Sequence, residues 1–365
     1  MEKQLKIFAL GGNEISPAGA VNSDTGKLIL PELSDQWKRT SNTCELLAKI
    51  IKEAPDDYYI ITHGNGPQVG NLLMNGNYKE MGSDIDICDA DTQGSMGYML
   101  SQLTNSLSIL GVNKVAAETV SKVVVDENDY AFRSPSKFIG PSFAKKDAME
   151  MQQKENRPFM FYKKDENGED LWRWVVPSPE PVEIIEIDVI EANLRAGIIP
   201  IAVGGGGIPV VKIKPEVIDG FEVYICKFGI SYQRKYSPNN LPANIYSGID
   251  AVIDKDLSSS LLGISLIKRA NARGENLHVE LFIFTDIDGV KLNYQQPNQI
   301  DVRHLTLDEA RRLYNENVFP AGSMGPKIKA AINFLEGGGK KVYITNSEFY
   351  DETLKGNAGT LIEKD

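Results

Sequence analysis

The sequence predicts an α/β sandwich with a mostly parallel central sheet. Short apolar runs typical of buried strands alternate with longer segments whose apolar residues recur at helical spacing. The alternation extends over most of the 365 residues, and a hydrophobic fraction of 42% is sufficient for a sizeable core. We therefore expect a single α/β domain over residues 1–365, in which strands, turns and helices follow one another repeatedly.

The chain up to residue 203 contains five expected elements. Residues 5–10 are an apolar run that ends at two glycines, which is typical of a buried strand before a tight turn. Residues 37–54 have helical spacing, and residues 58–62 form the next expected strand. Residues 182–197 predict a helix closed by its last glycine, and residues 198–203 follow as a strand.

The rest of the chain continues the same pattern. Residues 251–254 are expected to be a short strand before a helix over 257–270. A very apolar run predicts a buried strand at 277–285. Two helices and one strand complete the expected fold, over 305–317, 325–338 and 341–345.

Two regions interrupt the alternation. Residues 125–178 are polar and rich in Lys, Pro and Met, and they contain a hairpin-like segment around Asn167 and Gly168. We expect this region to be an insertion that stands away from the main sheet. Residues 212–248 lack a helical period and contain two closely spaced prolines, so we expect a loop-rich insertion there.

Composition excludes several classes of function. The net charge of −11 argues against non-specific binding to nucleic acid or to an anionic membrane, because both require basic patches. The three cysteines are few and widely spaced, which favours a reducing, cytoplasmic setting over a disulfide framework or a zinc site. We identify neither a signal peptide nor an apolar run long enough to cross a membrane.

Glycine clusters follow three of the expected strands. They are "ALGGNE" with Gly11, Gly12 and Asn13, "THGNGPQVG" with Gly64, Asn65 and Gly66, and "AVGGGGIPV" with Gly204, Gly205, Gly206 and Gly207. Ligands bind near the carboxyl ends of parallel strands, where glycine lets backbone N–H groups approach a phosphate. Each cluster alone is compatible with a tight turn, but three at equivalent positions favour a shared anion site.

The segment "HGNGPQVG" is close to the fingerprint of dinucleotide-binding proteins. It has one residue too many before the last glycine, and Asp84 and Asp86 lie near the spacing of a ribose-binding acid. His63, beside it, is more often structural than a catalytic base. A dinucleotide-dependent dehydrogenase is therefore the weakest of the alternatives.

Charged residues accompany three further strand ends or helix starts. "VIDKDLSSSLL" places Asp254, Lys255 and Asp256 before a helix, where they either serve phosphoryl chemistry or form a solvated helix start capped by Asp256. "FTDIDGVKLNY" contains Asp286 in an Asx-type turn or a nucleotide-facing loop. "AGSMGPKIKAAINFL" begins a helix near Lys327. The pattern differs from that of a P-loop, and the sequence contains no protein-kinase signature.

Taken in order, these segments resemble the amino acid kinase superfamily and, within it, the carbamate kinase family. The resemblance also includes "DIDICDADTQGSMGYML", "SPSKFIGPSF", "RWVVPSPEPVEIIE" and "GNAGTLI", and it covers most of the chain from Lys6 to Ile362. It implies an open three-layer αβα sandwich and a homodimer, with residues 125–178 as a small protruding subdomain over the site. It also implies the reaction ATP + carbamate ⇌ ADP + carbamoyl phosphate, with Mg²⁺ carried by the nucleotide, in arginine or purine-derived catabolism.

The resemblance assigns a role to each group of site residues. The glycine loops would hold the phosphoryl group and carbamate, so that a side chain there would occupy the place of the ligand. Lys255 would stabilise the transferring phosphoryl group, Lys137 would reach in from the subdomain, and Lys327 would contact the nucleotide phosphates. Asp256 would hold these lysines or Mg²⁺. The walls of the nucleotide pocket would include Asp286, Tyr294 and Met324.

Some positions depart from the pattern of the family. Ala9 replaces a lysine of many amino acid kinases, in agreement with carbamate kinases, in which the subdomain lysine takes over. Glu14 adds a negative charge after the first glycine pair, and Asp89 stands where the family more often has glycine. These changes leave two alternatives open: a related kinase with another carboxylate acceptor, and a non-catalytic protein that binds nucleotide or carbamoyl phosphate.

Overall fold

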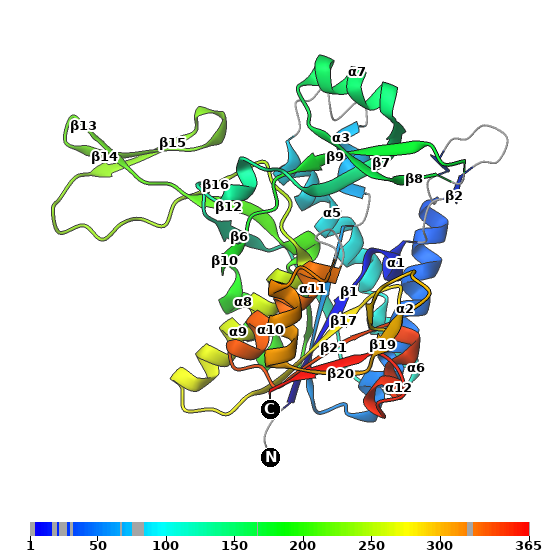
Figure 1. Ribbon diagram of the computed structural model, residues 1–365. Coiled ribbons are helices and arrows are strands. Elements are labelled where there is room, and N and C mark those ends of the chain that lie inside the picture. Colours follow the sequence, from blue (N-terminus) through cyan, green and yellow to red (C-terminus); the bar gives the residue numbers. More distant parts are fainter. Residues whose placement is uncertain are drawn as a thin grey trace.

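The computed structural model describes residues 4–16, 20–21, 28–29, 32–65, 68–74, 84–165, 167–319 and 324–364. Its central feature is an eight-stranded sheet (Figure 1) with the strand order β20-β22-β21-β17-β1-β4-β11-β5. Neighbouring strands are parallel except for β21 and β22. The strands are β1 (Gln4–Leu10), β4 (Tyr58–His63), β5 (Ala116–Thr119), β11 (Ile199–Ala202), β17 (His278–Phe284), β20 (His304–Thr306), β21 (Lys341–Thr345) and β22 (Thr360–Glu363).

Helices cover both faces of this sheet. Along β1, Leu5 and Ile7 belong to the core on one face, whereas Phe8 and Leu10 belong to the core on the other. Because both faces are buried, the strand has a nearly continuous apolar sequence. The first core includes residues of α8 (Ile187–Arg195), α9 (Lys255–Ala272), α10 (Leu307–Asn315) and α11 (Met324–Glu336), and the second includes residues of α2 (Leu33–Glu53), α5 (Ile85–Leu100) and α6 (Leu103–Ile109). The architecture is the three-layer αβα sandwich that the sequence predicts.

A second, smaller sheet stands apart from the main one (Figure 1). It consists of β7 (Lys137–Ala144), β8 (Phe159–Lys164) and β9 (Asp170–Val176), all antiparallel, with α7 (Lys145–Glu155) between β7 and β8. The turn from β8 to β9 contains Gly168 at φ +83°, a conformation that glycine adopts without steric penalty. The hairpin expected around Asn167 and Gly168 is therefore confirmed.

The region 212–248 differs from the loop-rich insertion that the sequence predicts. It contains an antiparallel three-stranded arm of β13 (Glu216–Ile218), β14 (Phe221–Ile225) and β15 (Ser231–Lys235), which projects far from the body (Figure 1). The arm lies in the chain between β12 and β16, two strands of a four-stranded sheet of order β10-β6-β12-β16. The regular structure of this region is an antiparallel sheet, and the absence of helical periodicity in the sequence does not exclude short strands. The other strands are β6 (Lys122–Val125), β10 (Pro181–Ile184), β12 (Ile208–Lys212) and β16 (Tyr246–Gly248).

Two expected elements are wrong in detail. The helix expected over 182–197 is divided into β10, which pairs with β6, and the shorter α8. The strand expected over 251–254 has no regular secondary structure. Val252 donates its N–H to Pro177 O, and Asp254 caps α9 instead of pairing in a sheet. In both places tertiary hydrogen bonds override the local pattern.

Candidate active site

Loops that follow four strands of the central sheet line one cavity of about 560 Å³. Gly12 follows β1, Gly64 and Asn65 follow β4, Gly205 follows β11, and Asp286 follows β17. The carboxyl ends of these parallel strands meet at one edge of the sheet, which is where open α/β sheets bind their ligands. The sequence prediction that separate strand ends contribute to one site is consistent with this arrangement.

Three lysine side chains meet at the cavity, each from a different element. Lys137 is the first residue of β7, and its Nζ lies 2.6 Å from Asp254 Oδ2. Lys255 begins α9 and donates to Asp256 Oδ1. Lys327, in the first turn of α11, has its Nζ 3.1 Å from Asp256 Oδ2. All five side chains line the cavity, so positive charge gathers where several chain segments converge.

Local sequence explains how α9 presents two of these groups. Asp254 Oδ1 accepts a hydrogen bond from Asp256 N at 2.9 Å, so Asp254, and not Asp256, is the N-cap. The next turn is tied to the glycine loop, because Ser258 Oγ donates to Gly206 O at 2.6 Å. The start of α9 is thereby held against the loop after β11, and its partial positive charge faces the cavity.

The charges of the lysine cluster depend on one another. Burial favours the neutral carboxyl of Asp254, but Lys137, Lys327 and Lys255 outweigh burial and hold the pKa of Asp254 below its usual range. Burial lowers the pKa of Lys255, an effect that Asp256 partly offsets. Burial also opposes the charge of Lys327, yet Asp256 and Asp254 raise the pKa of Lys327 above its ordinary value. The cluster is a set of desolvated, mutually compensating ions.

Most residues selected from the sequence lie around this cavity. Beside the lysines and Asp256, the lining includes Gly12, Gly64, Asn65, Gly205, Asp286, Tyr294 and Met324. Gly11, Gly204 and Gly206 are not among the lining residues. Asn13 belongs to α1 (Gly12–Ile15), but its side chain, like the whole of Gly66, lies outside what the structure describes.

The glycine run at 204–207 has a different physical reason from the one that the sequence suggests. A Cβ added to Gly204 would lie 2.4 Å from His63 Nε2, and one added to Gly206 would lie 2.4 Å from Ile253 O. Gly205, at φ +67°, would meet Asn65 Nδ2 at 2.1 Å. A side chain in this run would therefore meet protein atoms first, and the expectation that it would occupy the place of the ligand is not needed to explain the glycines.

Sequence reasoning missed several lining residues. Phe138 and Tyr162 come from the small sheet, and Phe319 follows α10. Lys291 also lines the cavity, and its Nζ lies 2.6 Å from Asp301 Oδ1. Lys291 lies within the quoted "FTDIDGVKLNY", so its charge near Asp286 was a usable signal. The aromatic residues show no spacing that would have marked them.

The Glu14 side chain does not contribute to the cavity, although its sequence position after the first glycine pair suggested a place near the substrate. Its side chain is buried, and Glu14 Oε2 accepts a hydrogen bond from Ser347 Oγ at 2.8 Å. Thr43 Oγ1 donates to Glu14 O at 2.6 Å. Glu14 is not among the residues that line the cavity. Its charge is engaged in joining α1, α2 and the segment after β21.

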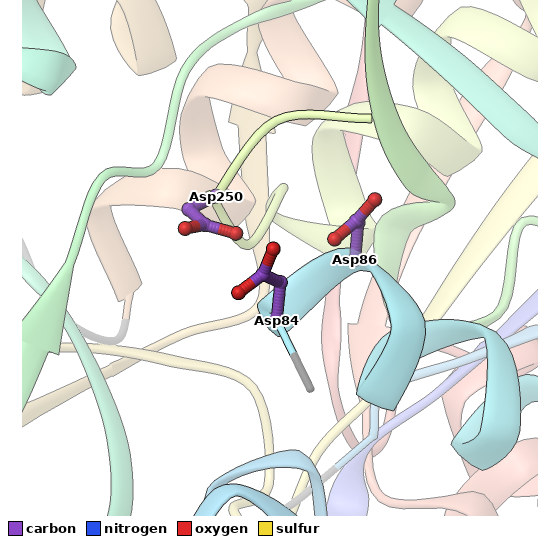
Figure 2. Close-up of side chains that lie close together, drawn as sticks. All are labelled: Asp84, Asp86 and Asp250. Carbon is purple, nitrogen blue, oxygen red and sulfur yellow. The ribbon is translucent and has the colours of Figure 1, made fainter. Parts of the chain in front are cut away.

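The acids at the start of α5 also have a structural partner. Asp84, Asp86 and Asp250 form the one group among the described residues in which three potential metal ligands come together (Figure 2). Lys227 Nζ lies 2.7 Å from Asp84 Oδ2, 2.7 Å from Asp86 Oδ1 and 3.3 Å from Asp250 Oδ1. An ammonium group thus occupies the centre of the cluster and joins the arm to the body. A ribose-binding role for Asp84 or Asp86 is not needed to explain them.

Oxygen ligands for Mg²⁺ are present at the cavity but are already engaged. Both carboxylate oxygens of Asp256 accept from lysines, and Asp254 is shared between Lys137 and the helix cap. These residues fit a magnesium ion that arrives bound to nucleotide phosphates better than one held by protein alone, because Mg²⁺ requires several oxygen ligands in octahedral geometry.

His63 is buried at the end of β4, and burial lowers its pKa to about 4. The ring is therefore neutral at neutral pH, and His63 does not line the cavity. This agrees with the expected structural role.

Among the helices that the structure describes, none combines the length and the apolar character that a bilayer-spanning segment requires.

Comparison with known proteins places these observations in a family. A model of the amino acid kinase family matches residues 269–346. The carbamate kinase of Thermococcus kodakarensis is 33% identical over 366 aligned residues, which cover 98% of this chain and 99% of that protein. The carbamate kinase of Thermoplasma acidophilum is 36% identical over 357 aligned residues, and the alignment covers 98% of both chains.

The chain belongs to the carbamate kinase family.

Solved structures agree with this membership in the carbamate kinase family. The carbamate kinase of Giardia lamblia bound to AMP-PNP has a TM-score of 0.72 and 30% identity, with coverage of 100% of this chain and 99% of that one. The structure of the same protein bound to citric acid has a TM-score of 0.75 and 29% identity, with the same coverage. The αβα architecture is thus shared over the entire length.

Proposed function

We propose that this chain is a carbamate kinase, a phosphotransferase that catalyses ATP + carbamate ⇌ ADP + carbamoyl phosphate. The observation that carries the proposal is the convergence of Lys137, Lys255 and Lys327 on one cavity at the carboxyl ends of parallel strands. Phosphoryl transfer requires in-line positioning and positive charge around the moving group, and it requires little covalent chemistry from the protein. Three lysines and a backbone-lined floor meet both requirements.

We assign a separate role to each lysine according to its position in the cavity. Lys255 stands beside the helix start at the centre of the cluster, and we assign it to the transferring phosphoryl group. Lys327 lies on the side of Met324, Asp286 and Tyr294, which line the same cavity and form the proposed nucleotide wall. Lys137 approaches from the small sheet. Asp256 favours the charged forms of Lys255 and Lys327 and holds both side chains in place, since each of its oxygens accepts from one ammonium group.

The acceptor end is formed mainly by backbone. Gly12, Gly64, Asn65 and Gly205 line the cavity at the ends of β1, β4 and β11. Carbamate and the phosphoryl group offer few atoms to bind, so backbone N–H groups of the loops are suited to hold them. We also assign Gly11, Asn13, Gly66, Gly204 and Gly206 to this end of the site, because the sequence places them beside these lining residues. A Mg²⁺ ion bound to the nucleotide would neutralise part of the phosphate charge.

We further propose that residues 125–178 act as an inserted lid over the site and that the protein works as a homodimer. The lid role is supported by Lys137, Phe138 and Tyr162, which the small sheet contributes to the cavity. The dimer is supported by exposed Tyr98, Ile109 and Val115 near the β5 edge of the central sheet. Light scattering after size-exclusion chromatography would report the mass in solution.

We place the protein in the cytoplasm, in the catabolism of arginine or purine-derived compounds, with ATP formation from carbamoyl phosphate as its role. The three cysteines are free thiols, which agrees with a reducing compartment. ATP, ADP, carbamate and carbamoyl phosphate are the proposed ligands, with no part for nucleic acid or membrane.

The decisive experiment measures ATP formation from Mg-ADP and carbamoyl phosphate, coupled to hexokinase and glucose-6-phosphate dehydrogenase. A reaction without protein corrects for spontaneous breakdown of carbamoyl phosphate. A preparation of Lys255→Ala, purified identically, corrects for contaminating kinases. ATP formation by the wild type alone supports the proposal. If the protein binds ADP but forms no ATP, the acceptor is another small carboxylate or the protein is a binding protein.

A further inference from the structure

Three buried polar atoms without hydrogen-bond partners lie beneath the glycine loop at the acceptor end. They are His63 Nε2, Asn65 Oδ1 and Asp89 Oδ2, and none has a partner within the described part of the chain. The glycine loop brings them together, because Cβ atoms added to Gly204 and Gly205 would meet His63 and Asn65 respectively. Buried polar atoms normally have partners, so an unpaired group at a ligand site requires an explanation.

Asp89 and Asn65 form the centre of this group. Asp89 lies on α5 and is 0% exposed, and its Oδ1 accepts a hydrogen bond from Asn65 Nδ2. Asn65 lines the cavity, whereas Asp89 does not. Burial and the nearby Asp86 raise the pKa of Asp89 well above its usual value. Asp89 is therefore a buried acid, and its only described hydrogen-bond partner through the side chain is Asn65.

The bond to Asp89 determines how the Asn65 amide is oriented. A primary amide has a donor end and an acceptor end. Because Asp89 engages the Nδ2 donor, the Oδ1 acceptor is left for a donor supplied by a ligand. Carbamate and carbamoyl phosphate carry an –NH₂ group, whereas acetate and acetyl phosphate carry a methyl group in its place. An acceptor oxygen distinguishes these two classes, since only the amino group can donate.

We propose that Asp89 is a positioning residue that orients the Asn65 amide so that Asn65 Oδ1 accepts a hydrogen bond from the amino group of the small substrate. Asp89 thereby favours carbamoyl phosphate over acyl phosphates of the same size that lack this group. This inference rests on the proposed function and specifies how its acceptor site selects the substrate.

The test compares carbamoyl phosphate with acetyl phosphate as phosphoryl donors to Mg-ADP. The ratio of the two kcat/KM values is measured for the wild type, Asp89→Ala and Asp89→Asn. If acetyl phosphate is not turned over, its inhibition constant against carbamoyl phosphate replaces its kcat/KM. Cys88→Ala is the matched control, because Cys88 is the buried neighbour of Asp89 on α5 and packs in the apolar cluster with Val69 and Trp174.

We expect Asp89→Ala to reduce the preference for carbamoyl phosphate by roughly 10-fold or more, mainly through KM, with KM for ADP unchanged. Asp89→Asn retains an acceptor for Asn65 Nδ2 and should stay within about 3-fold of the wild type. Cys88→Ala should keep the wild-type ratio. In a double-mutant cycle, Asn65→Ala should remove the effect of Asp89→Ala on this ratio.

Two outcomes would overturn the inference. Unchanged kcat/KM values for both substrates in Asp89→Ala would mean that Asp89 has only a structural role. An equal loss with both substrates, which also leaves the ratio unchanged, would mean that Asn65 contacts atoms that both substrates share and not the amino group. Asp89→Asn keeps the test decisive if Asp89→Ala does not fold, since loss of the preference in the asparagine variant also contradicts the inference. Failure of the proposed function would be recognised separately, because the wild type would then form no ATP from carbamoyl phosphate.

Discussion

Lys137 and Asp254 are 117 residues apart in sequence, yet Lys137 Nζ lies 2.6 Å from Asp254 Oδ2. This ion pair links the small sheet to the start of α9, and both residues line the cavity. An incoming phosphate would compete with Asp254 for the same ammonium group. The contact therefore links the small sheet to the site, and in the proposed mechanism Lys137 would exchange Asp254 for an anionic ligand.

We predict that Lys137→Ala decreases kcat by roughly 10² to 10³, the range seen when one charge-stabilising donor is removed from a transition state. The fold should remain intact, because the Lys137 side chain is partly exposed and lies at the beginning of β7. The coupled ATP assay and circular dichroism measure the two effects. The exposed Lys146 on α7 is the control. Lys146→Ala should behave as the wild type, and normal turnover in Lys137→Ala would contradict the mechanism.

We predict that Asp256→Ala lowers both stability and turnover. Its carboxylate is 2% exposed and accepts from Lys255 and Lys327, so its removal leaves two desolvated ammonium groups without their main counter-charge. Breaking a buried ion pair in this way costs about 3–5 kcal/mol of the free energy of unfolding. Urea denaturation checks the stability. An unchanged midpoint would show that the two lysines are adequately solvated by the cavity.

We predict that Gly206→Ala is strongly destabilising whether or not a ligand is bound. Its φ is +99°, and the new Cβ would lie 2.4 Å from the backbone oxygen of Ile253. Strain and overlap together should lower the free energy of unfolding by more than about 2 kcal/mol. Gly94 on α5 is the matched control, because a Cβ there meets nothing within 4 Å. Gly94→Ala should be neutral or stabilise by up to about 1 kcal/mol.

We predict that Glu118 makes stability depend on pH. Burial raises the pKa of its carboxyl from 4.5 to about 8, and neither oxygen has a hydrogen-bond partner in the described ranges. Between these two values the folded state binds more protons than the unfolded state, so stability falls as pH rises. Glu118→Gln should remove this decline. Urea midpoints at pH 5 and pH 8 measure it, with Glu53→Gln on an exposed turn of α2 as the control. Parallel pH profiles for wild type and Glu118→Gln would contradict the prediction.

We predict that His63 gives stability the opposite dependence on pH, in the acid range below pH 6.5. Burial lowers the pKa of His63 from 6.5 to about 4, so the unfolded state binds the additional proton between these values. Stability should therefore decrease as pH falls from 6.5 towards 4. His63→Gln, which cannot take up this proton, should lessen the decrease. The midpoint of urea denaturation at several pH values in this range is the measurement, and an unaltered acid slope in the variant would exclude His63 as its source.

The sequence was sufficient for the αβα architecture and for the main residues of the candidate site. Strands such as β1 and β17 can be recognised as short, continuous apolar runs, because both faces of each strand are buried. Lys255 and Lys327 could be identified because each lies at the start of a helix that follows a glycine-rich or acidic segment. Their actual grouping with Lys137 depends on tertiary contacts, and the family resemblance supplied what local patterns lacked.

The rest depends on partners that are distant in sequence. Nothing near Gly204 indicates that His63 will lie against it, so the glycines were attributed to a ligand. Nothing near Asp84 and Asp86 indicates that Lys227 will lie between them. The sequence pattern does not mark the strands of the arm. β13 is short and exposed, and in β14 the buried positions are Glu222 and Tyr224, whereas the exposed ends are apolar.

The position of β1 in the middle of the main sheet sets an order of assembly for the newly made chain. On one side β1 pairs with β4, which is synthesised soon afterwards, but on the other it pairs with β17 (His278–Phe284). A ribosome-bound chain therefore leaves the backbone N–H and C=O groups along one edge of β1 unpaired until β17 has emerged. An edge of this kind pairs readily with other strands. We expect nascent fragments that end before β17 to require chaperones and to aggregate when released, whereas the completed chain closes the sheet itself.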